Sequence, residues 1–307
     1  MLVPERGRPE TIVVKSRITE ECTRSNSRVA TLAPYLRLTC ASQQAHARYL
    51  SIMQTSPDAP IAPRTLEIPI DSIEGARLAT PFATRLEVCH DLSTEGWTPK
   101  MELVRACREA VEGTQATIVA MIRPEFPGCR RELDVAAFAT TPKLLDLSLR
   151  EIESAAAAGA HSVGVSLLTP DGFVDMEANA KLIAHARDFG LVVAFLRTYD
   201  LLVDRARGMR DLSALGFTRF ITAGVLGWDA SIATLDERIA VLKQDVENAA
   251  LEAKRLGRAP IEVIPGGGVR GANARRWLAI SPHLHASCRR DGVIARAELE
   301  HLRDEMR

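Results

Sequence analysis

Short apolar runs alternate with amphipathic segments along the chain from about residue 64 onward. The apolar runs predict buried strands at 65–70, 84–89, 116–122, 160–166, 191–196, 218–222, 261–265 and 283–287. Between them, apolar residues recur at helical spacing, which predicts helices at 99–111, 143–158, 176–189, 204–215, 231–256 and 271–278. Glycines stand where four of these helices should turn into strands, as expected at helix C-termini: Gly159, Gly190, Gly216 and Gly257.

Strict alternation of strands and helices predicts an α/β fold with a parallel sheet. Eight strands within about 240 residues fit a (β/α)8 TIM barrel. A doubly wound open sheet would alternate in the same way. However, no G-x-G-x-x-G run follows the first expected strand, which argues against a dinucleotide-binding fold. We therefore expect a TIM barrel over 64–307.

Residues 1–63 lack this periodicity and are rich in Arg, Ser and Thr, with few acidic residues. Three interpretations stay open: a disordered extension, an over-extended start with Met53 as the true initiator, or an organelle transit peptide. The basic composition is compatible with a transit peptide, although the segment shows no convincing amphipathic helix. We therefore divide the chain into an N-terminal extension, 1–63, and a barrel, 64–307.

The overall composition argues against several classes of partner. The formal net charge of the 307 residues is zero at pH 7, so no basic surface indicates a nucleic acid or an anionic membrane. No stretch approaches the ~18 apolar residues of a membrane span. The six cysteines show no C-x-x-C or zinc-like spacing, and scattered thiols without a secretory leader predict a cytoplasmic location. A homo-oligomer stays open, because apolar helix faces could form an interface that the sequence does not locate.

Residues of one parity along a strand point the same way, and this rule places charged side chains inside the barrel. Charges of both signs would meet there, as burial requires, because an unpaired buried ion costs several kcal/mol. The side chains expected to face the barrel axis are Glu67, Pro69, Arg85, Glu87, Cys89, Val119, Met121, Arg123, Val193, Phe195, Arg197, His283, His285 and Ser287.

Two interpretations of these buried charges compete. In the first, carboxylates act as acid or base at the barrel mouth while Arg123 and Arg197 clamp an anionic group. In the second, the charges form an ion-pair network that only sets the packing. Arg123, Arg197 and Asp200 follow strand ends, where the active sites of barrels lie. The catalytic candidates are therefore Glu67, Glu87, Arg123, Arg197, Asp200 and His285.

Three consecutive glycines follow the seventh expected strand. In TIM barrels, the loops after strands seven and eight often bind phosphate through backbone N–H groups at a helix start. A tight turn in left-handed backbone, with Asn273 capping the next helix, would explain the same run without a ligand. The anion-binding candidates are Gly266, Gly267, Gly268 and Arg270.

Soft metal ligands are few. Cys89 and His90 are adjacent, but neighbouring side chains on a strand point opposite ways, so the pair does not form a chelate. Thiolate and imidazole suit Cu(I) or zinc, whereas a buried cysteine also serves as a small core residue. His283 and His285 share one strand face, as metal ligands or as hydrogen-bonded core groups. The metal-ligand candidates are Cys89 and His285.

Several segments together resemble the CutC copper homeostasis family, a family of TIM barrels. The resemblance covers about residues 64–305, and the order and spacing of its motifs make it fairly specific. It implies copper homeostasis, and a barrel mouth like that of an enzyme without an agreed reaction. The matching motifs are L-E-I (66–68), R-L-E-V-C (85–89), E-G-x-T-P (95–99), M-I-R-P (121–124), L-x-x-D-G-x-V-D (168–175), F-x-R-x-Y-D (195–200), L-G-F-x-R (215–219), P-G-G-G-V-R (265–270), H-x-S (285–287) and D-G (291–292).

The chain departs from the family pattern at three places. Pro69 replaces the cysteine of the family's E-x-C strand, and Leu196 replaces the histidine of its F-H-R motif. The I-R-P-R-G-G-D-F loop becomes 122–127, in which Glu125 reverses a charge, and an insertion of several residues follows. These changes remove a thiol and an imidazole that could ligate copper. The family residues that remain are Glu67, Glu87, Arg123, Arg197, Asp200 and His285.

Three functions stay open at this point. The first is a CutC-like role in copper homeostasis, with Cu(I) bound by Cys89 and then His285. The second is a barrel enzyme acting on a small anionic or phosphorylated metabolite. In that case the two arginines and the 266–268 loop would hold the anion, and Glu87 or Glu67 would move protons. The third is a pseudoenzyme scaffold for a partner, suggested by Leu196 and the altered loop.

Overall fold

The computed structural model describes residues 63–307. The three interpretations of the segment 1–63, including an initiator at Met53, concern residues that lie almost wholly outside this described part. The elements, in chain order, are β1 (Thr65–Ile70), α2 (Ile73–Ala79), β2 (Arg85–Val88), η1 (Leu92–Thr94), α3 (Met101–Ala110), β3 (Thr117–Met121), α4 (Val135–Phe138), α5 (Pro142–Ala157), β4 (Ser162–Val165), α6 (Met176–Asp188), β5 (Val192–Phe195), η2 (Arg197–Leu201), α7 (Arg205–Leu215), β6 (Arg219–Thr222), η3 (Ala230–Ile232), α8 (Leu235–Leu256), β7 (Glu262–Pro265), α9 (Gly271–Leu278), β8 (His283–His285), β9 (Arg289–Arg290), β10 (Val293–Ile294) and α10 (Arg296–Glu305).

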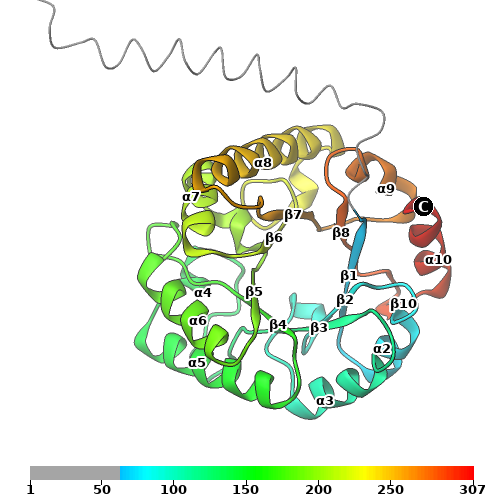
Figure 1. Cartoon of the computed structure of the whole chain (residues 1–307), viewed down its shortest axis with the longest axis horizontal. Coiled ribbons are helices and arrows are strands. Elements are labelled where there is room, and N and C mark those ends of the chain that lie inside the picture. Colours follow the sequence, from blue (N-terminus) through cyan, green and yellow to red (C-terminus); the bar gives the residue numbers. More distant parts are fainter. Residues whose placement is uncertain (1–62) are drawn as a thin grey trace, which may run out of the picture. The chain divides into compact units, whose positions relative to one another are not determined.

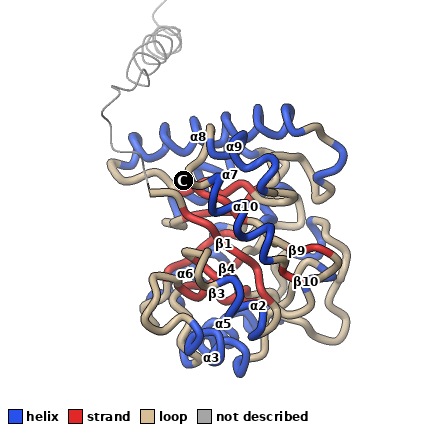
Figure 2. The backbone as a smooth tube through the Cα atoms, turned by 90° about the vertical axis from the view of Figure 1, so that its right-hand side faces the viewer, coloured by secondary structure: helices blue, strands red, loops and turns tan. Residues whose placement is uncertain are grey.

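Eight parallel strands form the barrel, in the order β7-β6-β5-β4-β3-β2-β1-β8. Strands β7 and β8 lie side by side where the ring closes (Figure 1). The helices surround the strands (Figure 1), and the view in Figure 2 shows the β9–β10 hairpin beyond the strands, against α2. The predicted (β/α)8 TIM barrel is therefore confirmed.

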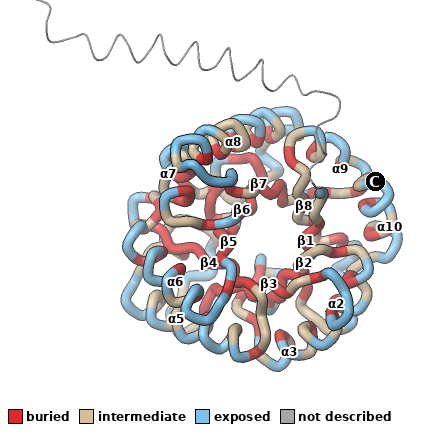
Figure 3. The backbone as a smooth tube through the Cα atoms, in the orientation of Figure 1, coloured by how far each residue is buried: buried red, intermediate tan, exposed pale blue. Residues whose placement is uncertain are grey.

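The main hydrophobic core lies between the strands and the surrounding helices, and Figure 3 shows that most strand residues are buried. It takes one face of each strand, such as Ile68 of β1, Leu86 of β2 and Ile118 of β3, all fully buried. The predicted helix-ending glycines are confirmed, since all four have positive φ angles of 64–89°. The sequence analysis missed α2, α4, α10 and the β9–β10 hairpin. None of the helices in the described range has the length and apolar character needed to cross a membrane.

One predicted strand orientation is wrong. Val193 and Phe195 of β5 were expected inside the barrel, but both belong to the core layer between strands and helices. Leu196 instead reaches the interior, where it packs with Cys89 and Met121. The run 191–196 is apolar throughout, so it carries no alternation from which the parity of the strand could be read.

The loop after β6 packs closely against the start of α8, on the side where the strands end. Gly224 has φ +71°, and a Cβ atom at this position would lie 2.5 Å from the backbone oxygen of Arg238 in α8. Gly227 has φ +97° in the same loop, but a Cβ there would meet no atom within 4 Å. The two glycines therefore share the same backbone requirement, and only Gly224 also has a steric one.

We predict that Gly224→Ala lowers the free energy of unfolding by about 2–5 kcal/mol, because it adds a clash with helix backbone to the cost of left-handed backbone. Gly227→Ala is the matched control and should cost only about 1–2 kcal/mol, from backbone strain alone. Urea unfolding of both variants measures the difference. Equal losses would show that the loop does not depend on its contact with α8.

Candidate functional site

A pocket of about 290 Å3 opens at the ends of the barrel strands. Residues that follow β2, β3, β5, β6 and β7 contribute to it, together with the end of β8, as expected for the active-site face of a TIM barrel. Its lining includes most of the candidates chosen from the sequence, namely Glu87, Cys89, Arg123, Arg197, Gly267, Gly268 and His285. The structure thus brings these seven candidates together at one pocket.

Glu67, Glu87 and His285 form a cluster inside the barrel. Strand pairing sets Glu67 directly beside His285, with β2 on the other side of β1. Nδ1 of His285 lies 3.1 Å from Oε1 of Glu67, and its Nε2 lies 3.9 Å from Oε2 of Glu87. One ligand atom from each of the three residues lies within 4.8 Å of the other two.

Glu67 also forms ion pairs with two arginines. Nε of Arg85 donates to Oε2 of Glu67 at 2.9 Å, and Nε of Arg219 lies 3.6 Å from the same oxygen. Burial alone would raise the pKa of Glu67, but the hydrogen bond with His285 and the charges of Arg219 and Arg85 outweigh it and lower the pKa to about 2. Glu67 is therefore a fixed anion at neutral pH. Arg219, at the start of β6, is a partner that the sequence analysis did not identify.

Glu87 behaves in the opposite way. Burial, reinforced by the negative charge of Glu67, raises the pKa of Glu87 to about 7 despite the opposing charges of His285 and Arg219. For His285, burial lowers the pKa, but the hydrogen bond to Glu67 and the charges of both carboxylates give a net rise. Two neighbouring carboxyl groups thus differ in pKa, with Glu67 ionised at neutral pH and Glu87 titrating near pH 7.

Two arginines at the mouth lie over tryptophan rings. The guanidinium carbon of Arg123 is 3.9 Å from the ring centre of Trp97, and that of Arg197 is 4.4 Å from the ring centre of Trp228. Such stacking holds a guanidinium group in place. Arg197 also donates to the Trp228 carbonyl oxygen and lies 3.7 Å from a carboxylate oxygen of Glu95. Neither tryptophan was among the candidate site residues of the sequence analysis, although each lies in a loop that follows a strand.

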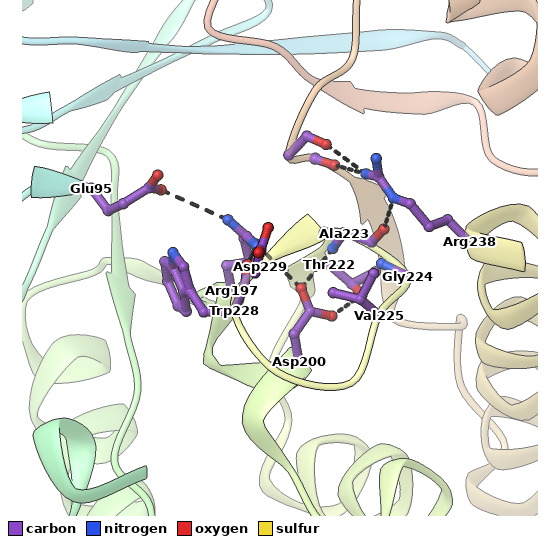
Figure 4. A network of polar contacts seen from close by, with 12 residues as sticks. Glu95, Arg197, Asp200, Thr222, Ala223, Gly224, Val225, Trp228, Asp229 and Arg238 are labelled. Atoms are coloured by element: carbon purple, nitrogen blue, oxygen red, sulfur yellow. Dashed lines mark hydrogen bonds and ion pairs between the residues drawn. The ribbon is translucent and has the colours of Figure 1, made fainter. Parts of the chain in front are cut away.

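Asp200 does not line this pocket, and its contacts are with the protein around it (Figure 4). Its fully buried carboxylate accepts hydrogen bonds from the Ala223 backbone N–H at 2.7 Å, from the Thr222 hydroxyl at 2.5 Å and from Arg205 at 3.0 Å. It also accepts one from Nε of Arg197 at 3.3 Å. Asp200 therefore holds the loop after β6 and positions Arg197.

The glycine loop lies next to Arg197. Gly267 and Gly268 have φ angles of +64° and +95°, and a Cβ on Gly267 would lie 3.6 Å from the guanidinium carbon of Arg197. Arg238 of α8 donates to the carbonyl oxygens of Gly266 and Gly267 (Figure 4), and Asn273 accepts from the backbone N–H of Arg270. The loop is therefore a left-handed turn followed by a capped helix, as expected without a ligand. It also borders the pocket. Arg270 itself donates to Ser287 at 3.1 Å.

Cys89 is completely buried and packs with Met121 and Leu196. Burial, with the nearby charge of Glu87, raises the pKa of the Cys89 thiol well above its usual range, so the free protein carries it as a neutral thiol. Cys89, Met121 and His285 nevertheless line the same pocket. Of the other histidines considered, His283 bonds to Thr65 at 2.8 Å, and His90 is exposed.

Comparison with known proteins places the chain. The model of the CutC family matches residues 64–288. The human copper homeostasis protein cutC homolog is 31% identical over 230 residues, which cover 73% of each chain. A CutC family protein of Vibrio atlanticus is 30% identical over 225 residues, covering 72% of this chain and 81% of the relative. The solved structure of CutC from Streptococcus agalactiae shares the fold, with a TM-score of 0.61 at 22% identity over 76% of this chain and 100% of that one. Together, the family match, these identities and the shared barrel show that the chain belongs to the CutC family.

Proposed function

We propose that this protein acts in copper homeostasis, the role named for its human and mouse relatives, and that Cu(I) binds in the mouth pocket. The supporting observation is that a thiol, a thioether and an imidazole, those of Cys89, Met121 and His285, line one pocket. These are ligands that favour Cu(I) over harder cations. The free cysteines of the described chain also fit a reducing compartment, and we place the protein in the cytoplasm.

The surroundings of the proposed ligands define how they would act. Glu67 holds Nδ1 of His285, which leaves Nε2 as the nitrogen available to a metal, in the manner of carboxylate–histidine pairs at metal sites. The Cys89 thiol must lose its proton to bind, so copper affinity should rise with pH. Pro69 and Leu196 border the same pocket and provide no ligand atom. Cys89 is therefore the ligand on which the proposal depends most.

We predict that the reduced full-length protein binds one Cu(I) ion and that Cys89→Ser weakens this binding by more than about tenfold. Cys107→Ser is the matched control, because Cys107 is equally buried but lies in α3 within the main core. A competition titration with a Cu(I) chelator measures both variants. Unchanged affinity in Cys89→Ser would reject the site.

A second function, acid–base catalysis on a small anionic metabolite, is favoured by a different observation. The pKa of Glu87 is raised to about 7 next to His285, and both residues line a pocket bordered by two stacked arginines. Arg197 and Arg123 would hold the anion, and Glu87 and His285 would donate and accept protons. Glu67 is occupied by His285 and two arginines, so its role would be to orient the imidazole.

The protonation of Glu87 has a measurable effect on stability. Because folding raises its pKa from 4.5 to about 7, its contribution is fully present below pH 4.5 and is lost as pH rises through about 7. His285, whose pKa is also raised, contributes with the same sign. We predict that Glu87→Gln weakens the fall in unfolding free energy between pH 5 and 8, and is more stable than the wild type at pH 8. Urea unfolding at several pH values in this range tests the prediction. The exposed Glu112→Gln is the control, and its unfolding free energy should change with pH as that of the wild type does.

We predict that inorganic phosphate raises the melting temperature of the wild type, because a ligand that binds only the folded state stabilises it. Arg197→Ala should lose this increase, whatever its own melting temperature, since the comparison is made with and without phosphate for each protein. Arg210→Ala, on the exposed face of α7, should respond like the wild type. A phosphate response that survives Arg197→Ala would place the anion elsewhere.

A further inference from the structure

A second cavity, of about 230 Å3, lies beneath the connection between β3 and α5. Its walls include strand-end residues such as Val165, the first turns of α5 such as Leu144, and Leu182 of α6. Arg123 and Phe138 line both this cavity and the mouth pocket, so the two spaces adjoin. The covering segment, residues 124–141, includes the part of the chain that is longer than the family pattern.

The lining of this cavity is mainly apolar, and its charges have one sign. Three cationic residues border it, Arg123, Arg130 and Lys143, and among the described residues no Asp or Glu does. Arg130 is paired with Asp134, which lies outside the lining, and Lys143 lies over the Phe126 ring. An apolar chamber with cations but no carboxylates at its edge favours an anion with an apolar body.

Two buried polar atoms at the cavity have no hydrogen-bond partner among the described residues: Nη2 of Arg123 and Oγ of Ser166. Both residues are more than nine-tenths buried. The guanidinium group of Arg123 is fixed by the Trp97 and Phe138 rings and by a bond from Nη1 to the Gly96 carbonyl at 3.0 Å. Buried donors without partners are costly, and an anionic ligand would satisfy Nη2.

We propose that this cavity holds the apolar body of an anionic ligand whose charged group is bound by Arg123, at the junction with the mouth pocket. The size is sufficient, since an apolar cavity of about 150 Å3 can hold a benzene molecule. This inference rests on the proposed action on an anionic metabolite, and it specifies the substrate class as a phosphate or carboxylate with a ring or branched chain. The charged end would then lie close to Glu87 and His285.

The test compares ligands that differ only in the apolar body, by calorimetric titration of the full-length protein. Phenyl phosphate should bind at least about tenfold more tightly than inorganic phosphate, because the ring removes apolar surface from water. Phenylacetate and acetate form the parallel carboxylate pair. The pair whose aromatic ligand binds more tightly identifies whether the charged group is a phosphate or a carboxylate. Arg123→Gln should lose the binding, whereas Arg131→Gln, an exposed neighbour, should retain it.

Variants of Ser166 locate the ring. Ser166→Leu fills the cavity and should reduce the gain from the ring to less than about threefold, with phosphate binding unchanged. Ser166→Ala is the matched control, because it keeps the space, and the gain should persist. Cys129 gives a readout in the wild type that needs no variant, since it is half-buried at the cavity wall. Phenyl phosphate, and not inorganic phosphate, should slow its alkylation as followed by peptide mass spectrometry.

The outcomes separate this inference from the proposed function. If phosphate binds through Arg123 but the ring adds no affinity and no protection of Cys129, the cavity assignment is wrong and the anion site stands. If the ring still increases the affinity of a folded Ser166→Leu protein to the same extent, the cavity assignment is also wrong. If none of the four ligands binds, both the cavity assignment and the action on an anionic metabolite fail.

Discussion

The buried carboxylate of Glu67 is the interaction on which the site depends. It joins four strands, because it contacts Arg85 of β2, Arg219 of β6 and His285 of β8 from its own position in β1. Two arginines in the barrel interior would be strongly unfavourable without this anion. By staying ionised, Glu67 also favours the protonated forms of both His285 and Glu87. The packing of the barrel and the acid–base properties of its mouth therefore have one electrostatic origin.

The mouth is arranged around that fixed charge by contacts between loops. Asp200 has no direct part in the pocket, yet its bonds hold both Arg197 and the loop after β6. Arg238 then ties the glycine loop to α8, which places Gly267 beside Arg197. The two early interpretations of the buried charges are thus compatible. The same ion pairs that stabilise the barrel also keep the cationic groups of the mouth in position.

The proposed copper site and the proposed anion site would use different parts of one pocket. The soft donors Cys89 and Met121 lie together, with the apolar Leu196 where the family pattern has a histidine. Arg123 and Arg197, each stacked on a tryptophan, line the same pocket and carry no soft ligand. His285 is common to both proposals, because Glu67 orients it in either case. The two proposals would require different protonation states of this histidine, because a metal ligand must be neutral and a proton donor protonated.

The sequence by itself determined the alternating architecture and the inward direction of Glu67, Glu87 and His285. These follow from local patterns, because alternation of polar and apolar residues reports the face of a strand. The sequence could not give the parity of β5, whose residues are apolar throughout, nor the stacking of tryptophans on the arginines. Only the tertiary structure decided that the pKa of Glu67 is lowered while that of Glu87 is raised, and that a second cavity adjoins the mouth. Protonation and cavities depend on contacts between residues far apart in the chain, which no local pattern records.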